Sequence, residues 1–209
     1  MRALLLAEAR IVNLALHASQ IGLPIQPLAC ALRGANHGTQ AAHSRVVRCV
    51  QRLQAHSQRI EAASGVQLAI IAPDGRDAML QHAEQCRAAG IPFVFDPGQG
   101  LPMFSGEELA AFVEQADWVT VNDYEGKMLC ERTGWSLAEL SRKVRGLVVT
   151  LGAEGCEVWE QGEKTHVPGV AAAQVVDPTG CGDAWRGALL YGLERGWPLA
   201  RCAALGNRV

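Results

Sequence analysis

The sequence lacks the features of a membrane or secreted protein. It has no apolar run long enough to cross a bilayer, and the longest stretch without Asp, Glu, Lys or Arg, residues 11–32, still contains Asn, His, Gln and Pro. Glu8 and Arg10 interrupt what would be the apolar core of a signal peptide. We therefore expect a cytoplasmic protein without a membrane segment.

The cysteines do not follow a disulfide or zinc pattern. The chain has seven of them, an odd number, with no C-x-x-C pair and no Cys/His ligand spacing. Disulfide frameworks are also typical of secreted domains rather than of cytoplasmic ones. We expect reduced thiols that serve mainly as packing residues.

Charge is distributed unevenly along the 209 residues. The net charge is −2, but residues 1–60 carry seven Arg against one Glu, which leaves 12 basic and 20 acidic residues in the remainder. A nucleic-acid-binding chain would be expected to carry a basic excess over its main domain. We therefore expect no nucleic-acid partner.

Residues 1–60 also lack Phe, Tyr, Trp, Lys and Asp altogether, while four of the six histidines lie there. Residues 43–60 could form a basic amphipathic helix, so an ordinary solvated helical segment is one interpretation. The other is that this segment was not selected together with the rest of the chain.

From Val66 onward, strand-like and helix-like segments alternate regularly. We predict strands over residues 66–72, 91–95, 117–121 and 146–152, helices over 76–90, 105–116, 123–134 and 136–144, a hairpin over 155–170 with its turn at 161–164, a strand, glycine-rich loop and helix over 175–196, and a last helix over 198–209. Alternation of this kind is typical of an α/β fold, in which helices cover a parallel sheet.

Several common phosphate-binding and catalytic motifs are missing. The chain contains no G-x-x-x-x-G-K-[ST], G-x-G-x-x-G, H-E-x-x-H or G-x-S-x-G, and no protein-kinase H-R-D or D-F-G. A phosphate site in this chain must therefore be of another kind.

The stretch "VVDPTGCGDAW" combines a glycine-rich loop with an acid at a helix start. Gly180 and Gly182 permit a tight turn whose amides, together with the positive end of the helix, form an anion cradle. Asp183 could simply cap the helix. It could instead accept the proton of a hydroxyl that attacks phosphorus, while the amides stabilise the transferred group.

Three further segments follow predicted strands. Asn122 and Glu125 are oxygen donors that suit hydrated Mg²⁺, although Asn-x-x-Glu is equally a capping box. The segment from Thr150 to Gly155 would let backbone approach a nucleotide phosphate, or would be a plain turn, and Asp96 before Pro-Gly needs no more than turn chemistry. Because the carboxyl ends of parallel strands share one edge, all of these segments should meet at the ligand-binding rim.

In order, the motifs "FDPGQG", "NDYEGKML", "VVTLGAEG" and "VVDPTGCGDAW" resemble those of the ribokinase-like (PfkB) family of sugar and nucleoside kinases, over roughly residues 60–206. The segment "DPGQGLPMFSGEEL" is most similar to bacterial adenosine-kinase-like members. The resemblance implies a three-layer α/β/α fold with a mostly parallel sheet. It also implies transfer of phosphate from ATP to a hydroxymethyl or similar alcohol of a sugar or nucleoside.

The resemblance further implies roles for individual residues. Asp183 corresponds to the catalytic base, and the amides of Gly180, Cys181 and Gly182 to the hole for the transferred phosphoryl group. The remaining roles fall on Asn122 and Glu125 for Mg²⁺ and its waters, on Thr150, Gly152 and Gly155 for the nucleotide, and on Asp177 and Thr179 for a metal ion, namely a monovalent cation.

The chain departs from the family at both ends. Residues 1–59 lack the substrate-binding acid, the Gly-Gly stretch with its Asn, and the strands of the lid, and the final helices that wall the adenine are also missing. We expect a fold truncated at both ends without a lid, with residues 1–59 foreign or translated out of frame and residues 60–209 forming the nucleotide-binding part. The functional alternatives are an active kinase and an inactive fragment that binds nucleotide weakly or only folds. A homodimer, which the lid often builds in this family, is a further expectation.

Overall fold

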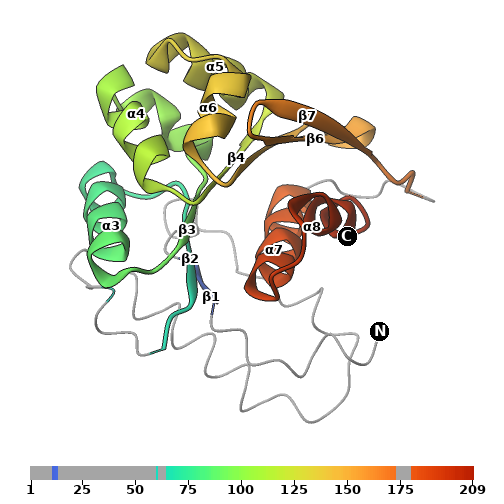
Figure 1. The fold of residues 1–209 in the computed structure, drawn as a ribbon, viewed down its shortest axis with the longest axis horizontal. Coiled ribbons are helices and arrows are strands. Elements are labelled where there is room, and N and C mark those ends of the chain that lie inside the picture. The colour runs from blue at the N-terminus through green and yellow to red at the C-terminus, as the bar shows by residue number, and fades with distance from the viewer. Residues whose placement is uncertain (1–10, 14–59, 61–64, 173–179) are drawn as a thin grey trace.

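The computed structural model describes residues 11–13, 60, 65–172 and 180–209, and these form one sheet with helices on both faces (Figure 1). The strands are β1 (Ile11–Asn13), β2 (Leu68–Ile71), β3 (Phe93–Phe95), β4 (Trp118–Asn122), β5 (Gly146–Thr150), β6 (Gly155–Glu160) and β7 (Glu163–Pro168). They lie in the order β1-β2-β3-β4-β5-β6-β7; neighbours from β1 to β5 pair in parallel, and β5-β6-β7 pair antiparallel. The predicted mostly parallel α/β sheet is confirmed.

The helices complete a three-layer arrangement. They are α3 (Arg76–Ala89), the 3-10 helix η2 (Gly98–Met103), α4 (Gly106–Gln115), α5 (Asp123–Thr133), α6 (Leu137–Lys143), the 3-10 helix η3 (Gly152–Glu154), α7 (Cys181–Glu194) and α8 (Leu199–Gly206). Figure 1 shows α3 to α6 on one side of the sheet and α7 with α8 on the other. This is the α/β/α architecture that the family resemblance implies.

Alternation along the strands builds a separate core on each face. Ile71 and Phe95 pack with the side chains of α3 to α6, whereas Ile70 and Val94 pack with those of α7 and α8. Because successive side chains of a strand point to opposite faces, a strand that is apolar throughout can serve both cores. The continuous apolar runs in this sequence are thus explained by burial on two sides.

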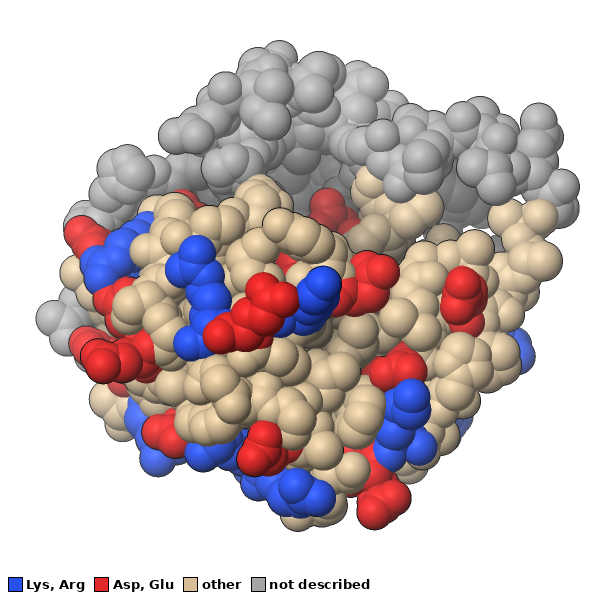
Figure 2. Space-filling view, turned by 90° about the horizontal axis from the view of Figure 1, so that it is seen from above, with Lys and Arg blue, Asp and Glu red and all other residues tan. Residues whose placement is uncertain are grey.

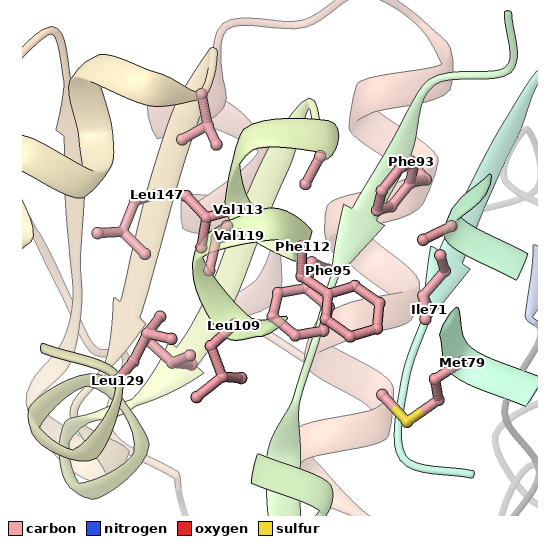
Figure 3. Close-up of a cluster of buried hydrophobic side chains, with 14 of the residues drawn as sticks. Ile71, Met79, Phe93, Phe95, Leu109, Phe112, Val113, Val119, Leu129 and Leu147 are labelled. Carbon is pink, nitrogen blue, oxygen red and sulfur yellow. The ribbon is translucent and has the colours of Figure 1, made fainter. Parts of the chain in front are cut away.

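Aromatic rings fill the centre of the larger core (Figure 3). Phe95 of β3 stacks on Phe112 of α4 with ring centroids 4.5 Å apart, and Phe104 meets Phe112 edge-on at 5.1 Å. All three rings are almost completely buried. Contacts of this kind fix α4 over the middle of the sheet.

Local sequence signals set the helix boundaries. Ser105, Asn122 and Ser136 each begin a helix with a complete capping box, in which the cap side chain and the Glu three residues later exchange hydrogen bonds with backbone amides. Gly90 ends α3 in the left-handed conformation, at φ 64°, as its position predicts. The helix and strand positions from residue 66 onward therefore follow the sequence-based prediction within a few residues.

The predicted turn over residues 161–164 is shorter in the structure. Strand β7 already begins at Glu163, so only Gln161 and Gly162 connect it to β6. Both have positive φ, 53° and 89°, which is the backbone form that suits a two-residue hairpin between twisted strands. The prediction of a longer turn was wrong because residues 163–166 are polar, as turn residues often are, but belong to an exposed edge strand.

Some predictions fall outside the described residues, namely the helix over residues 43–60 apart from its last residue, and the strand at residues 175–176.

In the part of the chain that is described, none of the helices combines the length and apolar character of a bilayer-spanning helix. The described cysteines are free thiols, of which Cys86, Cys156 and Cys202 are buried, and burial raises the pKa of each. On the face seen in Figure 2, acidic and basic side chains are interspersed.

Candidate active site

The carboxyl ends of the parallel strands gather the predicted site residues along one edge of the sheet. Asp96 directly follows β3, Asn122 is the last residue of β4, and Thr150 is the last residue of β5. Asn122 and Thr150 are direct neighbours in the strand register, and the Thr150 Oγ1 donates to the carbonyl of Val121 at 3.4 Å. The predicted convergence on one rim is therefore observed for these residues.

The glycine-rich loop leads directly into α7. Gly180 adopts the left-handed conformation at φ 83° and ψ 0°, and α7 begins at the next residue. No side chain caps this helix start, and the first helical hydrogen bond is that from the Ala184 amide to the Gly180 carbonyl, at 2.9 Å. The amides of Gly180, Cys181, Gly182 and Asp183 precede that bond and lack partners within the helix, as an anion cradle requires.

Asp183 lies in the first turn of α7 with its side chain 73% exposed. An acid here interacts favourably with the positive end of the helix, but it is not the residue that caps it, because Gly180 occupies the cap position. The capping interpretation of Asp183 is therefore not realised. The carboxylate is instead exposed, in the same helical turn as amides that have no partner within the helix.

Arg186 links Asp183 to the buried Asp96. The Nη2 of Arg186 donates to Oδ1 of Asp96 at 3.1 Å, its Nε pairs with Oδ2 of the same carboxylate, and its Nη1 lies 3.7 Å from Oδ1 of Asp183. The Asp96 side chain is only 1% exposed. Asp96 is therefore a buried ion-pair partner of Arg186, in addition to the turn residue that its Pro-Gly sequence suggests. The arrangement joins the ends of β3 and α7.

Electrostatic coupling ties four charged residues together at the rim. Burial raises the pKa of Asp96 to about 6, although Arg186 lowers it, and the charges of Glu125 and Asp183 raise it further. The pKa of Arg186 is lowered by burial, but the neighbouring carboxylates, Asp96 foremost, outweigh this effect and raise it overall. The rim therefore holds three carboxylates around one guanidinium, in an environment where charges interact strongly.

Asn122 and Glu125 form the capping box that the sequence left as one of two interpretations. The Glu125 amide donates to the Asn122 Oδ1 at 2.8 Å, and the Asn122 amide donates to the Glu125 Oε2 at 2.8 Å. In the part of the chain that the structure describes, backbone engages one carboxylate oxygen of Glu125 and not the other. Among the described residues, no three His, Cys, Asp or Glu side chains gather into a metal site of their own. The donor set fits a Mg²⁺ held through waters and nucleotide phosphates.

The segment after β5 turns back sharply into β6. Gly152 has φ 59° with open space where a Cβ would stand, whereas Gly155 has φ 97° with backbone of the β7 end packed against it. The Leu151 amide donates to the Gly155 carbonyl at 2.8 Å and so closes the turn. Backbone at Gly152 is therefore approachable from outside, and Gly155 maintains the turn.

Two hollows flank the sheet. One, of about 320 Å³, lies beside the rim between η2 and α5 and is lined by residues that include Leu101, Pro102, Tyr124, Glu125 and Met128. The other, of about 280 Å³, lies at the opposite edge near Cys86 and Arg145, away from the site residues. Of the predicted site residues, Asp177 and Thr179 lie outside the described part of the chain.

Arg186 is the site residue that the sequence analysis missed. Its partner Asp96 is 90 residues away in the chain, so no local pattern connects the two. The one available signal was its spacing, because a residue three positions after Asp183 lies on the same face of α7.

The sequence profile described as pfkB family carbohydrate kinase matches residues 30–209. The chain belongs to this family. The match begins upstream of residue 60, within the segment whose composition is atypical, and the boundary at residues 59 and 60 stays a prediction.

Two nucleoside kinases and a sugar kinase illustrate the likeness. The solved nucleoside kinase of Burkholderia thailandensis in complex with inosine is 44% identical, with a TM-score of 0.71 over 74% of this chain and 51% of that one. A "Nucleoside kinase" of Methanocaldococcus jannaschii is 31% identical over 54% of this chain and 37% of its own length. "Probable fructokinase-5" of Arabidopsis thaliana is 30% identical over 61% of this chain and 42% of its own. The chain thus spans about half, or less, of the length of these relatives.

Proposed function

We propose that this chain carries the nucleotide-binding and catalytic part of a kinase that transfers the γ-phosphoryl group of ATP to an alcohol of a nucleoside or sugar. The observation that carries the proposal is the exposed carboxylate of Asp183 beside the amides that open α7. An exposed acid next to an uncapped helix start suits a proton acceptor that works beside a bound anion. Family membership supports the same reaction class.

In the proposed reaction, Asp183 accepts the proton of the acceptor hydroxyl. The hydroxyl oxygen forms a bond to the γ-phosphorus, and the bond between that phosphorus and the bridging oxygen of ATP breaks, which leaves ADP. The amides of Gly180, Cys181 and Gly182 donate to the oxygens of the transferred group as negative charge develops there. Catalysis of phosphoryl transfer rests mainly on such positioning and charge stabilisation.

The nucleotide and its metal ion would use the neighbouring strand ends. Gly152 offers backbone that a phosphate can approach, Thr150 borders it, and Gly155 holds the turn in place. Glu125 and Asn122 would hold Mg²⁺ through its waters, and the ion would neutralise charge on the phosphates. Asp177 with Thr179 is the proposed position of a monovalent cation.

A nucleoside is the acceptor that we place first. The Burkholderia thailandensis kinase, at 44% identity, is solved with inosine and also in a form described as an ADP-inosine complex. Adenosine is the second acceptor to test, because the segment from Asp96 onward resembles adenosine-kinase-like proteins. Fructose and ribose represent the sugar alternative, which the Arabidopsis thaliana relative suggests.

A phosphorylation screen with inosine, adenosine, ribose and fructose, run beside calorimetry with ATP and Mg²⁺, tests the proposal. We expect turnover with a nucleoside, and we expect Asp183→Asn to lower kcat by about 100-fold or more while the Kd for ATP stays within about twofold. Asp77→Asn is the matched control. Like Asp183, Asp77 is an exposed acid in the first turn of a helix, but its helix, α3, contributes no residue to the proposed site.

The outcomes separate the alternatives. Full activity of Asp183→Asn would refute the role of this carboxylate. ATP binding without turnover of any acceptor would support the alternative of an inactive fragment. If ATP neither binds nor is turned over, the proposed nucleotide site is refuted.

A further inference from the structure

We propose that Arg186 is a positioning residue for the catalytic base, and that the buried carboxylate of Asp96 holds Arg186 in place for this task. The inference rests on the proposed function, because it assigns a role relative to Asp183 as base. It extends the site from the glycine-rich loop to the end of β3, through a side chain that carries no motif of its own.

One hydrogen bond, from Nη2, and one ion-pair contact, from Nε, orient the guanidinium of Arg186 on Asp96. Both oxygens of Asp96 are engaged, one by Nε and the other by Nη2 of Arg186. A two-point contact between a fork-shaped cation and a carboxylate restrains orientation as well as distance. The remaining nitrogen, Nη1, is thereby directed to Asp183, 3.7 Å away.

The glycine-rich loop is shaped to leave room for this guanidinium. A Cβ at Gly182 would stand 2.7 Å from Nη1 of Arg186, closer than a carbon and a nitrogen that are not bonded can approach. Gly182 therefore provides an amide for the cradle and also the space through which Arg186 reaches Asp183. The loop and the Asp96–Arg186 pair thus depend on each other.

The charges at the rim explain why Asp183 needs such a partner. Asp96 and Glu125 carry the same negative charge as Asp183 and lie in the same group of interacting charges. Bound ATP would add more negative charge beside them. Repulsion would turn an exposed carboxylate away from the phosphates. Arg186 offsets that repulsion and keeps the Asp183 side chain directed at the acceptor. Since Asp183 is 73% exposed, the contact adds little stability, and its contribution lies in orientation.

A purely structural role is the competing explanation, in which Arg186 only neutralises the buried Asp96. The double variant Asp96→Asn/Arg186→Gln separates the two, because it replaces the ion pair by a neutral pair that can still form a hydrogen bond. A structural role predicts that the double variant regains the Tm and the kcat of the wild type. A positioning role predicts that it regains the Tm, while kcat stays about 100-fold lower and the KM for ATP stays within about twofold, since misplacing a catalytic group by about 1 Å can cost that much.

Arg186→Lys is the second variant, which keeps a charge for Asp96 but cannot span both carboxylates. We expect it to fold and to lose at least about tenfold in kcat, again without a matching change in KM. The control is Glu194→Gln/Arg195→Gln, which removes another partly buried ion pair of α7, with N–O distance 3.0 Å, away from the rim. The control should lower Tm without lowering kcat at a temperature where the protein stays folded.

The result that overturns the inference is a kcat near that of the wild type in either Arg186→Lys or the double variant. Asp183→Asn, measured alongside, shows which proposal fails. If Asp183→Asn remains active, or if the wild type phosphorylates no acceptor, the proposed function falls and this inference with it. If Asp183→Asn is inactive but the Arg186 variants are active, only the positioning role is refuted.

Discussion

Alanine at the two glycines of the β5–β6 turn should separate a folding requirement from a binding requirement. Both Gly152 and Gly155 have positive φ, so a side chain at either position strains the backbone. Their surroundings differ. No atom of the described residues lies within 4 Å of a Cβ built on Gly152, whereas a Cβ on Gly155 would overlap the carbonyl oxygen of Val167 and the amide nitrogen of Gly169.

The expected loss of stability at Gly155 follows from these contacts. Its φ of 97° and ψ of −125° lie in a region that glycine alone adopts readily, and forcing another residue there costs about 2–3 kcal/mol. The overlapped atoms are backbone and cannot rotate away, so the hydrogen bond from the Gly169 amide to the Glu154 carbonyl, 3.1 Å long, should also be lost, at about 1 kcal/mol. Gly155→Ala should therefore lower the free energy of unfolding by about 3–4 kcal/mol.

Gly152→Ala should cost only the left-handed strain, about 1 kcal/mol. If nucleotide phosphate approaches the backbone at this position, the added methyl group occupies the space that the ligand needs. We therefore expect the Kd for ATP to rise at least about tenfold, which corresponds to about 1.4 kcal/mol.

Thermal unfolding and calorimetry with ATP and Mg²⁺ measure the two effects. In a chain of this size, about 1 kcal/mol shifts Tm by about 2–4 °C, so Gly155→Ala should melt about 10 °C lower and Gly152→Ala about 3 °C lower. Equal Tm values for the two variants would refute the argument from close backbone contact. An unchanged Kd in Gly152→Ala would refute the placement of the nucleotide at this turn.

Two further predictions concern the core and the buried acid. Phe112→Ala should lower the free energy of unfolding by about 3–5 kcal/mol, because the buried ring stacks on Phe95. Met103 is 44% exposed, so the control Met103→Ala should change the free energy of unfolding by less than about 1 kcal/mol in the same denaturant titration. Similar losses in the two variants would contradict this account of the core. Burial, opposed by Arg186, raises the pKa of Asp96 from 3.8 to about 6, so the folded chain binds a proton that the unfolded chain has released. The stability of the wild type relative to Asp96→Asn should therefore fall as pH rises from about 4 to about 6, by at most about 1.4 kcal/mol per pH unit, and a constant difference in unfolding free energy over that range would contradict the raised pKa.

Local signals predicted the elements of this fold well, because their causes are local. Ser105 and Ser136 carry the side chains that satisfy the first amides of α4 and α6, and Gly90 supplies the left-handed residue that ends α3. Each of these effects acts within a few residues of chain, so it is visible in sequence. The start of the edge strand β7 was harder to predict from sequence. Its first four residues are exposed and polar, and only their pairing with β6 identifies them as part of a strand.

The charged centre of the site could not be predicted in the same way. Asp96 before Pro-Gly has the sequence of a turn, and its burial depends on α7, which begins only at Cys181. Parallel topology predicted that β3 and the loop before α7 meet at one edge, but not which side chains pair there. Pairing depends on burial and on the space at Gly182, and both are properties of the assembled site.

Asn122 and Glu125 show that two interpretations posed as alternatives are compatible in three dimensions. The capping box uses the Asn122 Oδ1 and one oxygen of Glu125, and it fixes the Glu125 carboxylate at the end of β4. The charge of that carboxylate reaches across the rim, since it raises the pKa of Asp96. A carboxylate anchored by one oxygen leaves its second oxygen for the hydrated cation that we propose here. The capping box that starts α5 would then also hold the proposed metal-binding group in position, and a motif of this type is best tested for both roles together.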